Sequence, residues 1–112
     1  MQLDLKEKDS VSILVLSGTL TIGAQGQLVE AIDTLLETER TDILLDLTDL
    51  SYMDSVGIGE LVAAYRTVKG LGGVLKILGP TAKVRDALTL SQLLPIFEGF
   101  DDEESAVVSF AV

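Results

Sequence analysis

The residues with the clearest capacity for chemistry are Asp54 and Ser55, which are followed closely by Gly57 and Gly59. A serine hydroxyl can act as a nucleophile when a neighbouring base activates it. This chain contains no histidine, and the flanks of Ser55 lack the Gly-x-Ser-x-Gly pattern of hydrolases. The sequence therefore predicts that the chain is not an enzyme and that the stretch around Ser55 serves to contact a partner.

The same stretch could also suggest phosphate-binding or metal-binding chemistry. A phosphate-binding loop needs a lysine after its glycines, which Gly57 and Gly59 do not have. Asp46, Asp49 and Asp54 could form a magnesium pocket, because hard cations prefer carboxylate oxygens. The simpler interpretation, which we favour, is that Asp46 and Asp49 are strand-end and turn residues. We therefore predict no metal and no cofactor.

Ser55 also has a purely structural interpretation as the N-cap of a helix. A capping hydroxyl accepts a hydrogen bond from a free backbone N–H and contributes about 1 kcal/mol. Asp54 could do the same one position earlier. Gly57 and Gly59 weaken a capping-only interpretation, because each glycine early in a helix costs roughly 0.5–1 kcal/mol relative to alanine. Their presence predicts a bare, approachable surface beside the serine.

The segments around this stretch predict a strand, a helix and a second strand. Residues 43–47 form a short apolar run, and residues 74–78 form another. Between them, apolar residues recur at three- and four-residue steps, which predicts a helix over 58–71; they are Ile58, Leu61, Val62, Tyr65 and Val68. Such a unit forms a right-handed crossover in a parallel sheet. Asp54 and Ser55 then lie where the chain leaves a strand, a common position for function in α/β sheets.

The sequence before this unit predicts two strands and one helix. An alternation of apolar and polar residues at the start of the chain predicts an edge strand with one exposed face. Residues 11–16 predict an inner strand that pairs with the first as a hairpin. A loop is expected at 18–23, where Thr21 could cap a helix that runs from 24 to about 38.

The sequence after this unit predicts two more helices and one short strand. Gly79 and Pro80 interrupt the pattern, and Thr81 is expected to cap the next helix. A short strand is predicted at 96–97, and the four acidic residues at 101–104 predict the first turn of a closing helix. The order β-β-α-β-α-β-α-β-α predicts an α/β fold, a mixed sheet of about five strands packed against helices, in one domain of residues 1–112.

Composition limits the partners of this domain. Eighteen acidic residues against eight basic ones give a formal charge of -10, which disfavours nucleic acid and anionic membranes. No apolar stretch approaches the ~20 residues of a membrane span, and the first residues lack the features of a signal peptide. We expect a cytoplasmic protein. The sheet leaves edges that could pair, so a monomer or a weak dimer is expected.

The run Asp54-Ser55-Val56-Gly57-Ile58-Gly59, with its flanking segments, resembles the STAS domain family, and within it the single-domain anti-sigma factor antagonists (anti-anti-sigma factors). The resemblance implies that Ser55 is phosphorylated by an anti-sigma factor that is itself a serine kinase. It also implies that the unphosphorylated form binds this kinase and releases the sigma factor, and that a phosphatase resets the switch. The partner-binding residues would be Thr21, Asp54, Ser55, Val56 and Gly57.

Two positions differ from the pattern of many relatives. Val56 stands where many have a second serine or threonine, and Thr21 stands where many have an acidic residue. These differences favour an alternative within the same family: a scaffold, or a subunit associated with a membrane transporter, that binds its partner permanently and is never phosphorylated. Fold-level similarity does not separate the two functions.

Overall fold

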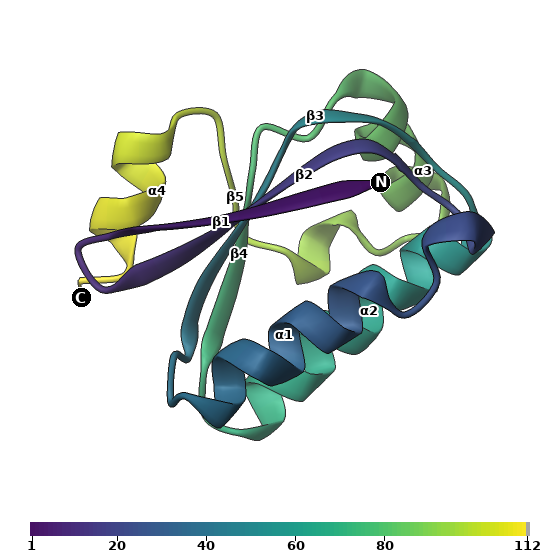
Figure 1. The fold of residues 1–112 in the computed structure, drawn as a ribbon. Coiled ribbons are helices and arrows are strands. Elements are labelled where there is room, and N and C mark those ends of the chain that lie inside the picture. Colours follow the sequence, from purple (N-terminus) through teal and green to yellow (C-terminus); the bar gives the residue numbers. More distant parts are fainter. Residues whose placement is uncertain (112) are drawn as a thin grey trace.

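A mixed β-sheet forms the centre of the molecule, which is known from a computed structural model that describes residues 1–111 (Figure 1). Its five strands are β1 (Gln2–Lys8), β2 (Val11–Leu20), β3 (Asp42–Met53), β4 (Val74–Leu78) and β5 (Gly99–Phe100). They lie side by side in chain order, with β1 antiparallel to β2 and the other pairs parallel. The predicted α/β fold with a five-stranded mixed sheet is confirmed.

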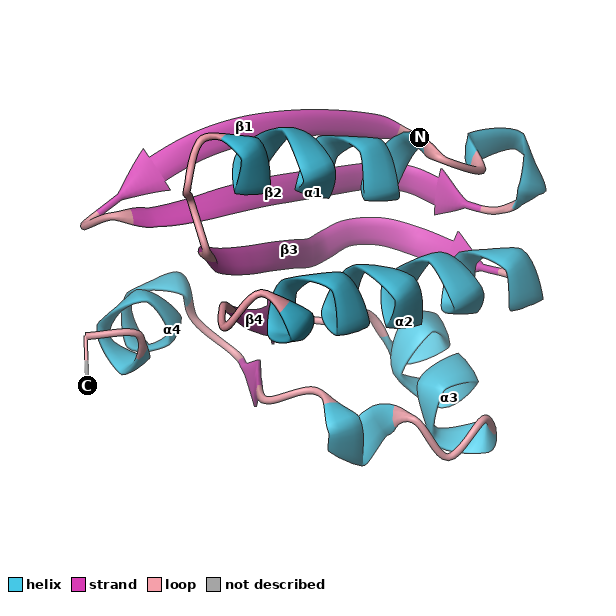
Figure 2. Ribbon diagram, turned by 90° about the horizontal axis from the view of Figure 1, so that it is seen from below, coloured by secondary structure: helices cyan, strands magenta, loops and turns pink. Residues whose placement is uncertain are grey.

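Helices cover both faces of the sheet unequally. Three of them pack on one face: α1 (Gln27–Glu37), α2 (Ser55–Gly70) and α3 (Ala82–Leu90). The closing helix α4 (Glu103–Ser109) lies on the other face, apart from these three (Figures 1 and 2). Two short 3-10 turns, η1 (Ile22–Ala24) and η2 (Leu94–Ile96), complete the fold. None of the helices within residues 1–111 is long and apolar enough to cross a membrane.

The core between the sheet and the three helices is aliphatic, as the composition requires. Leu61 and Val68 of α2 are buried, and Ile58, Val62 and Tyr65 pack against the same core. The predicted inward face of this helix is therefore confirmed. The predicted set of apolar residues did not include Ala64, which is also fully buried. Full burial of each large aliphatic side chain contributes roughly 1.5–3 kcal/mol.

β3 is much longer than the predicted strand at 43–47, and it contains two bulges that each insert one extra residue. Asp46 and Asp49 pair with β2 residues that are only two apart, so β3 carries one extra residue there, and a second follows before Tyr52. Each extra residue shifts the side-chain alternation. Leu47 and Leu50 can then both be buried at a three-residue spacing that no regular strand shows. Asp46 and Asp49 are consequently strand residues, not strand-end and turn residues.

The predicted last strand at 96–97 is wrong. Pro95 lies in the 3-10 turn η2, and the strand forms only afterwards, at Gly99 and Phe100. Phe97 is buried in the core, where its ring meets Tyr65 edge-on with the ring centroids 5.4 Å apart. The apolar character of this segment thus reflects packing against α2 and not pairing in the sheet.

Three other predicted boundaries move. β2 continues through part of the predicted loop to Leu20. α1 begins at Gln27 and not at residue 24, because Gly26 adopts a positive φ of 89° that ends the preceding 3-10 turn. Thr81 occupies the N-cap of α3 as predicted, but its hydroxyl donates a hydrogen bond to the Leu50 carbonyl (2.8 Å) and does not cap the helix.

The closing helix α4 is confirmed and is held by polar contacts at both ends. At its start, the Asp102 carboxylate accepts hydrogen bonds from the backbone N–H and the hydroxyl of Ser105, which lower the pKa of Asp102. At its end, the buried Lys76 ammonium of β4 donates to the hydroxyl (2.8 Å) and the carbonyl (3.2 Å) of Ser109. A buried ammonium requires such partners, so Lys76 fixes the position of α4.

Candidate functional site

Asp54 is the N-cap of α2 and also the link between two chain segments. One carboxylate oxygen accepts a hydrogen bond from the Gly57 N–H (2.9 Å), inside the first turn of the helix. The other accepts from the Ile22 N–H (3.2 Å) in the turn that follows β2. Figure 2 shows that β2 and β3 end on the same side of the molecule, next to the start of α2. Asp54 thus joins the two sequence regions that contain the predicted site residues.

Ser55 is the first residue of α2, and its side chain is exposed. Since Asp54 caps the helix, the alternative in which Ser55 is the N-cap is wrong. The Ser55 hydroxyl makes no hydrogen bond to any other part of residues 1–111, so it is free to react or to meet a partner. Val56, beside it, is half-buried.

Gly57 does not belong to a bare surface, contrary to the sequence interpretation. It is buried, and a Cβ built on it would lie 2.0 Å from the Leu20 carbonyl oxygen and 3.0 Å from the Met53 Cβ. The end of β2 can approach the first turn of α2 only because this residue lacks a side chain. Gly59 differs: a Cβ added to it would meet no atom of the described chain within 4 Å, and it is exposed as predicted.

A second carboxylate strengthens the same link, and no motif in the sequence points to it. The Glu60 side chain of α2 accepts a hydrogen bond from the Gly26 N–H (2.8 Å), at the start of α1. Asp54 and Glu60 therefore hold the segment between β2 and α1 at both of its ends. The signal in the sequence that could have indicated this role of Glu60 is its position. It is an acidic residue about one and a half turns into α2, a helix whose N-cap is already supplied by Asp54.

Thr21 lies directly before the Ile22 amide that Asp54 binds, so the structure brings it to the same site. Its predicted capping role is wrong: Thr21 stands at the N-cap position of η1, but its side chain makes no capping hydrogen bond there. The neighbouring Ile22 was not predicted as a site residue. Its side chain is 68% exposed, an unusual position for an isoleucine, and it adds an apolar element to the surface near Ser55.

The three aspartates considered for magnesium do not form a common pocket. One oxygen of the Asp46 carboxylate accepts hydrogen bonds from the Thr48 N–H (3.0 Å) and the Thr48 hydroxyl (2.7 Å). Both oxygens of Asp54 are bonded to backbone N–H groups. Within residues 1–111, no three acidic side chains group closely enough to hold a metal ion.

Comparison with known protein families shows which family the chain belongs to. The sequence model described as the STAS domain matches residues 2–106, nearly the whole chain. The chain belongs to the STAS domain family. Its relatives include the anti-sigma F factor antagonist of Paenibacillus polymyxa, which is 26% identical over 113 residues and covers 100% of this chain and 97% of that protein. The anti-sigma-B factor antagonist of Bacillus subtilis is 31% identical over 77 residues, which cover 69% of this chain and 70% of that protein.

Solved structures show the same fold. The Bacillus cell fate determinant SpoIIAA in its phosphorylated form superposes with a TM-score of 0.75 at 25% identity, covering 97% of this chain and 99% of that one. An anti-sigma factor antagonist from Mycobacterium paratuberculosis superposes with a TM-score of 0.85 at 20% identity, covering 96% and 92%. Within the STAS family, this chain therefore falls among the anti-sigma factor antagonists, which are regulators and not enzymes.

Proposed function

We propose that this STAS domain is an anti-sigma factor antagonist that is switched by phosphorylation of Ser55. In its unphosphorylated form it binds an anti-sigma factor with serine kinase activity, in the cytoplasm, and so releases the sigma factor. Transfer of a phosphate from ATP to Ser55 ends this binding, and a phosphatase restores it. The binding surface consists of Ser55 with Thr21, Asp54 and Val56, together with Ile22.

The observation that supports this proposal most directly is the state of Ser55. Its hydroxyl is exposed at the first residue of α2 and needs no internal hydrogen bond to be broken before it reacts. The backbone on both sides of the site is held in place, because the Asp54 carboxylate accepts hydrogen bonds from the amides of Gly57 and Ile22. A kinase would therefore meet Ser55 on a backbone that is held in one position. Gly57 contributes to the site by letting β2 pack closely and not by contact with the partner.

Phosphorylation would alter both the charge and the bulk of this surface. A phosphoserine adds about -1.5 to -2 charges at neutral pH. The helix dipole offsets this by about 0.3–1 kcal/mol at an exposed position. The carboxylates of Asp54 and Glu60 are bonded to backbone amides and not to the Ser55 hydroxyl, so their hydrogen bonds can persist. The fold should survive, while a closely packed partner would lose its contact through bulk and desolvation.

Val56 and Thr21 favour a second candidate within the family. The motif carries one hydroxyl where many relatives carry two, and no acidic side chain stands at position 21. A scaffold or transporter-associated subunit would need neither feature. Such a protein would bind its partner through the same end of the sheet but would remain bound whatever the state of Ser55.

The experiment that separates the two uses the purified chain, ATP and the cognate anti-sigma factor kinase. We expect one added phosphate in the intact mass, located at Ser55 by fragmentation. Ser55→Ala should remain unmodified and still bind the kinase in a pull-down, whereas Ser55→Asp should bind more weakly. Ser51→Ala is the control, because Ser51 is an exposed serine four residues away on β3; unlike that of Ser55, its hydroxyl donates a hydrogen bond to the Gly18 carbonyl (2.9 Å).

Each result bears on one part of the proposal. Phosphate on a residue other than Ser55 would refute the site. Equal binding of the kinase by the parent, Ser55→Ala and Ser55→Asp would refute the switch and support the permanent scaffold. Loss of modification in Ser51→Ala with full modification of Ser55→Ala would move the site into β3.

A further inference from the structure

β4 has an unpaired edge at Leu75. The Val74 N–H donates to the Thr41 carbonyl (2.9 Å) towards β3, and the Ile77 N–H donates to the Glu98 carbonyl (3.0 Å) on the opposite side. Because backbone groups alternate along a strand, the N–H and C=O of Leu75 point to the same side as those of Ile77. β5 pairs with only the last two residues of β4. Within residues 1–111, these groups of Leu75 therefore have no strand partner.

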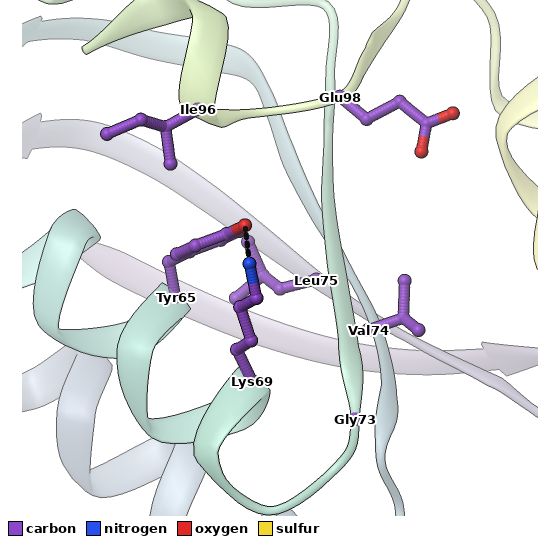
Figure 3. Close-up of a pocket in the computed structure, with 7 residues that line it drawn as sticks. All are labelled: Tyr65, Lys69, Gly73, Val74, Leu75, Ile96 and Glu98. Atoms are coloured by element: carbon purple, nitrogen blue, oxygen red, sulfur yellow. Dashed lines mark hydrogen bonds between the residues drawn. The ribbon is translucent and has the colours of Figure 1, made fainter.

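A pocket of about 340 Å³ lies at this open edge (Figure 3). Its volume falls within the roughly 300–1,000 Å³ of ligand-binding clefts. Side chains of α2 form one wall, and Ile96 and Glu98, just before β5, form the other. Ile96 is 41% exposed although it borders the pocket, so apolar surface is available there. The pocket thus places an apolar wall beside Leu75, a strand residue whose backbone groups have no strand partner and which is 5% exposed.

The charge inside the pocket is positive at its α2 wall. Figure 3 shows Tyr65 and Lys69 reaching from α2 into the pocket, where the Lys69 ammonium lies 3.4 Å from the Tyr65 hydroxyl. Lys69 forms no ion pair with any carboxylate of residues 1–111. Glu98 on the opposite wall is paired with Lys76 at 3.2 Å. An unpaired cation therefore faces the pocket, in a chain whose net charge is -10.

We propose that this groove binds a short extended peptide segment of a partner protein, which adds to the sheet beside β4. The peptide backbone would bond the free N–H and C=O of Leu75, as in other cases of β-strand addition. An apolar side chain would lie against Ile96 and Tyr65, and a carboxylate on the same face would pair with Lys69. Repulsion from the distant acidic residues is screened beyond about 8 Å at physiological salt.

This groove is separate from the surface proposed around Ser55. Ser55 and Lys69 lie near opposite ends of α2, fourteen residues apart, which corresponds to about 21 Å along a helix. A partner held at one end would leave the other accessible. Binding at the groove therefore does not depend on the phosphorylation switch, and either proposal can fail without the other.

The test is an amide-resolved NMR titration of the full chain with a capped pentapeptide, Val-Thr-Asp-Thr-Val, whose valines and aspartate share one face. We expect saturable shifts at the amides of Leu75 and Gly73, and near Tyr65. The same peptide with asparagine in place of aspartate should bind about two- to five-fold more weakly. A version with its central backbone nitrogens methylated should not bind, because it cannot form the strand hydrogen bonds.

Two lysine variants test whether Lys69 supplies the positive charge that the peptide carboxylate recognises. Lys69→Gln should abolish the preference for aspartate over asparagine, whereas Lys83→Gln, an exposed lysine on α3, should retain it. The proposal is overturned if Leu75 shows no saturable shift, or if the methylated peptide binds as well as the parent peptide. It is also overturned if acetate alone reproduces the shifts, which indicates a small-anion site. Concentration-dependent shifts at Leu75 without peptide would overturn it too, by assigning the groove to a second copy of this chain.

Discussion

Gly57 is the residue at which the site and the fold depend most directly on each other. A Cβ at this position would lie 2.0 Å from the Leu20 carbonyl oxygen, a contact that requires β2 and α2 to move apart. We expect Gly57→Ala to lower the free energy of unfolding by about 1–3 kcal/mol, measured by urea denaturation. Gly59→Ala is the control. The added Cβ would meet no atom of residues 1–111 within 4 Å, so Gly59→Ala should raise the stability by about 0.5–1 kcal/mol. A harmless Gly57→Ala would contradict this close packing.

Asp54 and Ser55 should separate stability from function. Asp54→Ala removes the acceptor for the amides of Gly57 and Ile22, so we expect it to cost about 1–2 kcal/mol in thermal or urea unfolding. Ser55→Ala removes an exposed hydroxyl that caps nothing, and its effect should stay within about 0.5 kcal/mol. If Ser55→Ala proved the more destabilising of the two, Ser55 and not Asp54 would be the helix cap.

For individual residues, the sequence predicts where the candidate site lies but not what role each of its residues has. Asp54 and Ser55 can be found because a polar pair stands between an apolar run and a helical repeat. The role of Gly57 cannot, since no local pattern tells which backbone atom will approach a glycine. Glu60 and Ile22 escape prediction because their importance comes from contacts across more than thirty residues, or from an exposure that only the tertiary structure determines.

The contribution of α4 to stability should depend on pH through its cap. Hydrogen bonds from the Ser105 amide and hydroxyl lower the pKa of Asp102 in the folded chain. Its stabilising effect is therefore complete above the ordinary aspartate pKa of about 3.9 and is lost as the pH falls through the lower folded value. We expect Asp102→Ala to be less stable than the parent near neutral pH. The difference should shrink in acid denaturation below about pH 4.

Lys6→Met is a useful companion variant, because Lys6 contacts the same helix through Glu103 at 2.7 Å. The hydrogen bond with Glu103 raises the pKa of Lys6, so the lysine stays charged across the acid range. If the pH-dependent difference between Asp102→Ala and its parent persists when both carry Lys6→Met, it does not come from the Lys6–Glu103 pair. A difference between Asp102→Ala and the parent that stayed constant with pH would contradict the assignment to the carboxylate.

Elements with a regular period can be predicted, and those shaped by irregular pairing cannot. The inward face of α2 and the bounds of β4 follow from apolar spacing that the structure preserves. Only five residues of β3 are predicted because its two bulges break the alternation that identifies a strand. The prediction of β5 fails for the opposite reason: Phe97 is apolar and buried, but it packs in the helical layer.

At the scale of the whole molecule, the formal charge of -10 leads to a prediction about nucleic acid. We expect no measurable affinity for DNA or RNA at physiological salt, because phosphate contacts by basic residues supply most non-specific binding. Within residues 1–111, three of the eight basic residues are already engaged in ion pairs, which are Lys6, Arg40 and Lys76. The measurement is fluorescence anisotropy with a labelled random duplex. Tight binding that weakens with added salt would reveal a basic patch that this charge distribution does not provide.

The strand order also bears on how the chain is made. Each strand pairs with the one synthesised just before it, so on the ribosome no later strand must be inserted between two earlier ones. The sheet face that α4 covers is completed only at the end of synthesis. Its apolar residues, which include Val11, Ile13 and Leu44, stay uncovered until the last helix has been made. About thirty residues separate the end of β4 from the end of α4, which is roughly 2–6 s of synthesis at about 5–20 residues per second. During those seconds the nascent chain presents an apolar sheet face, a natural substrate for chaperones.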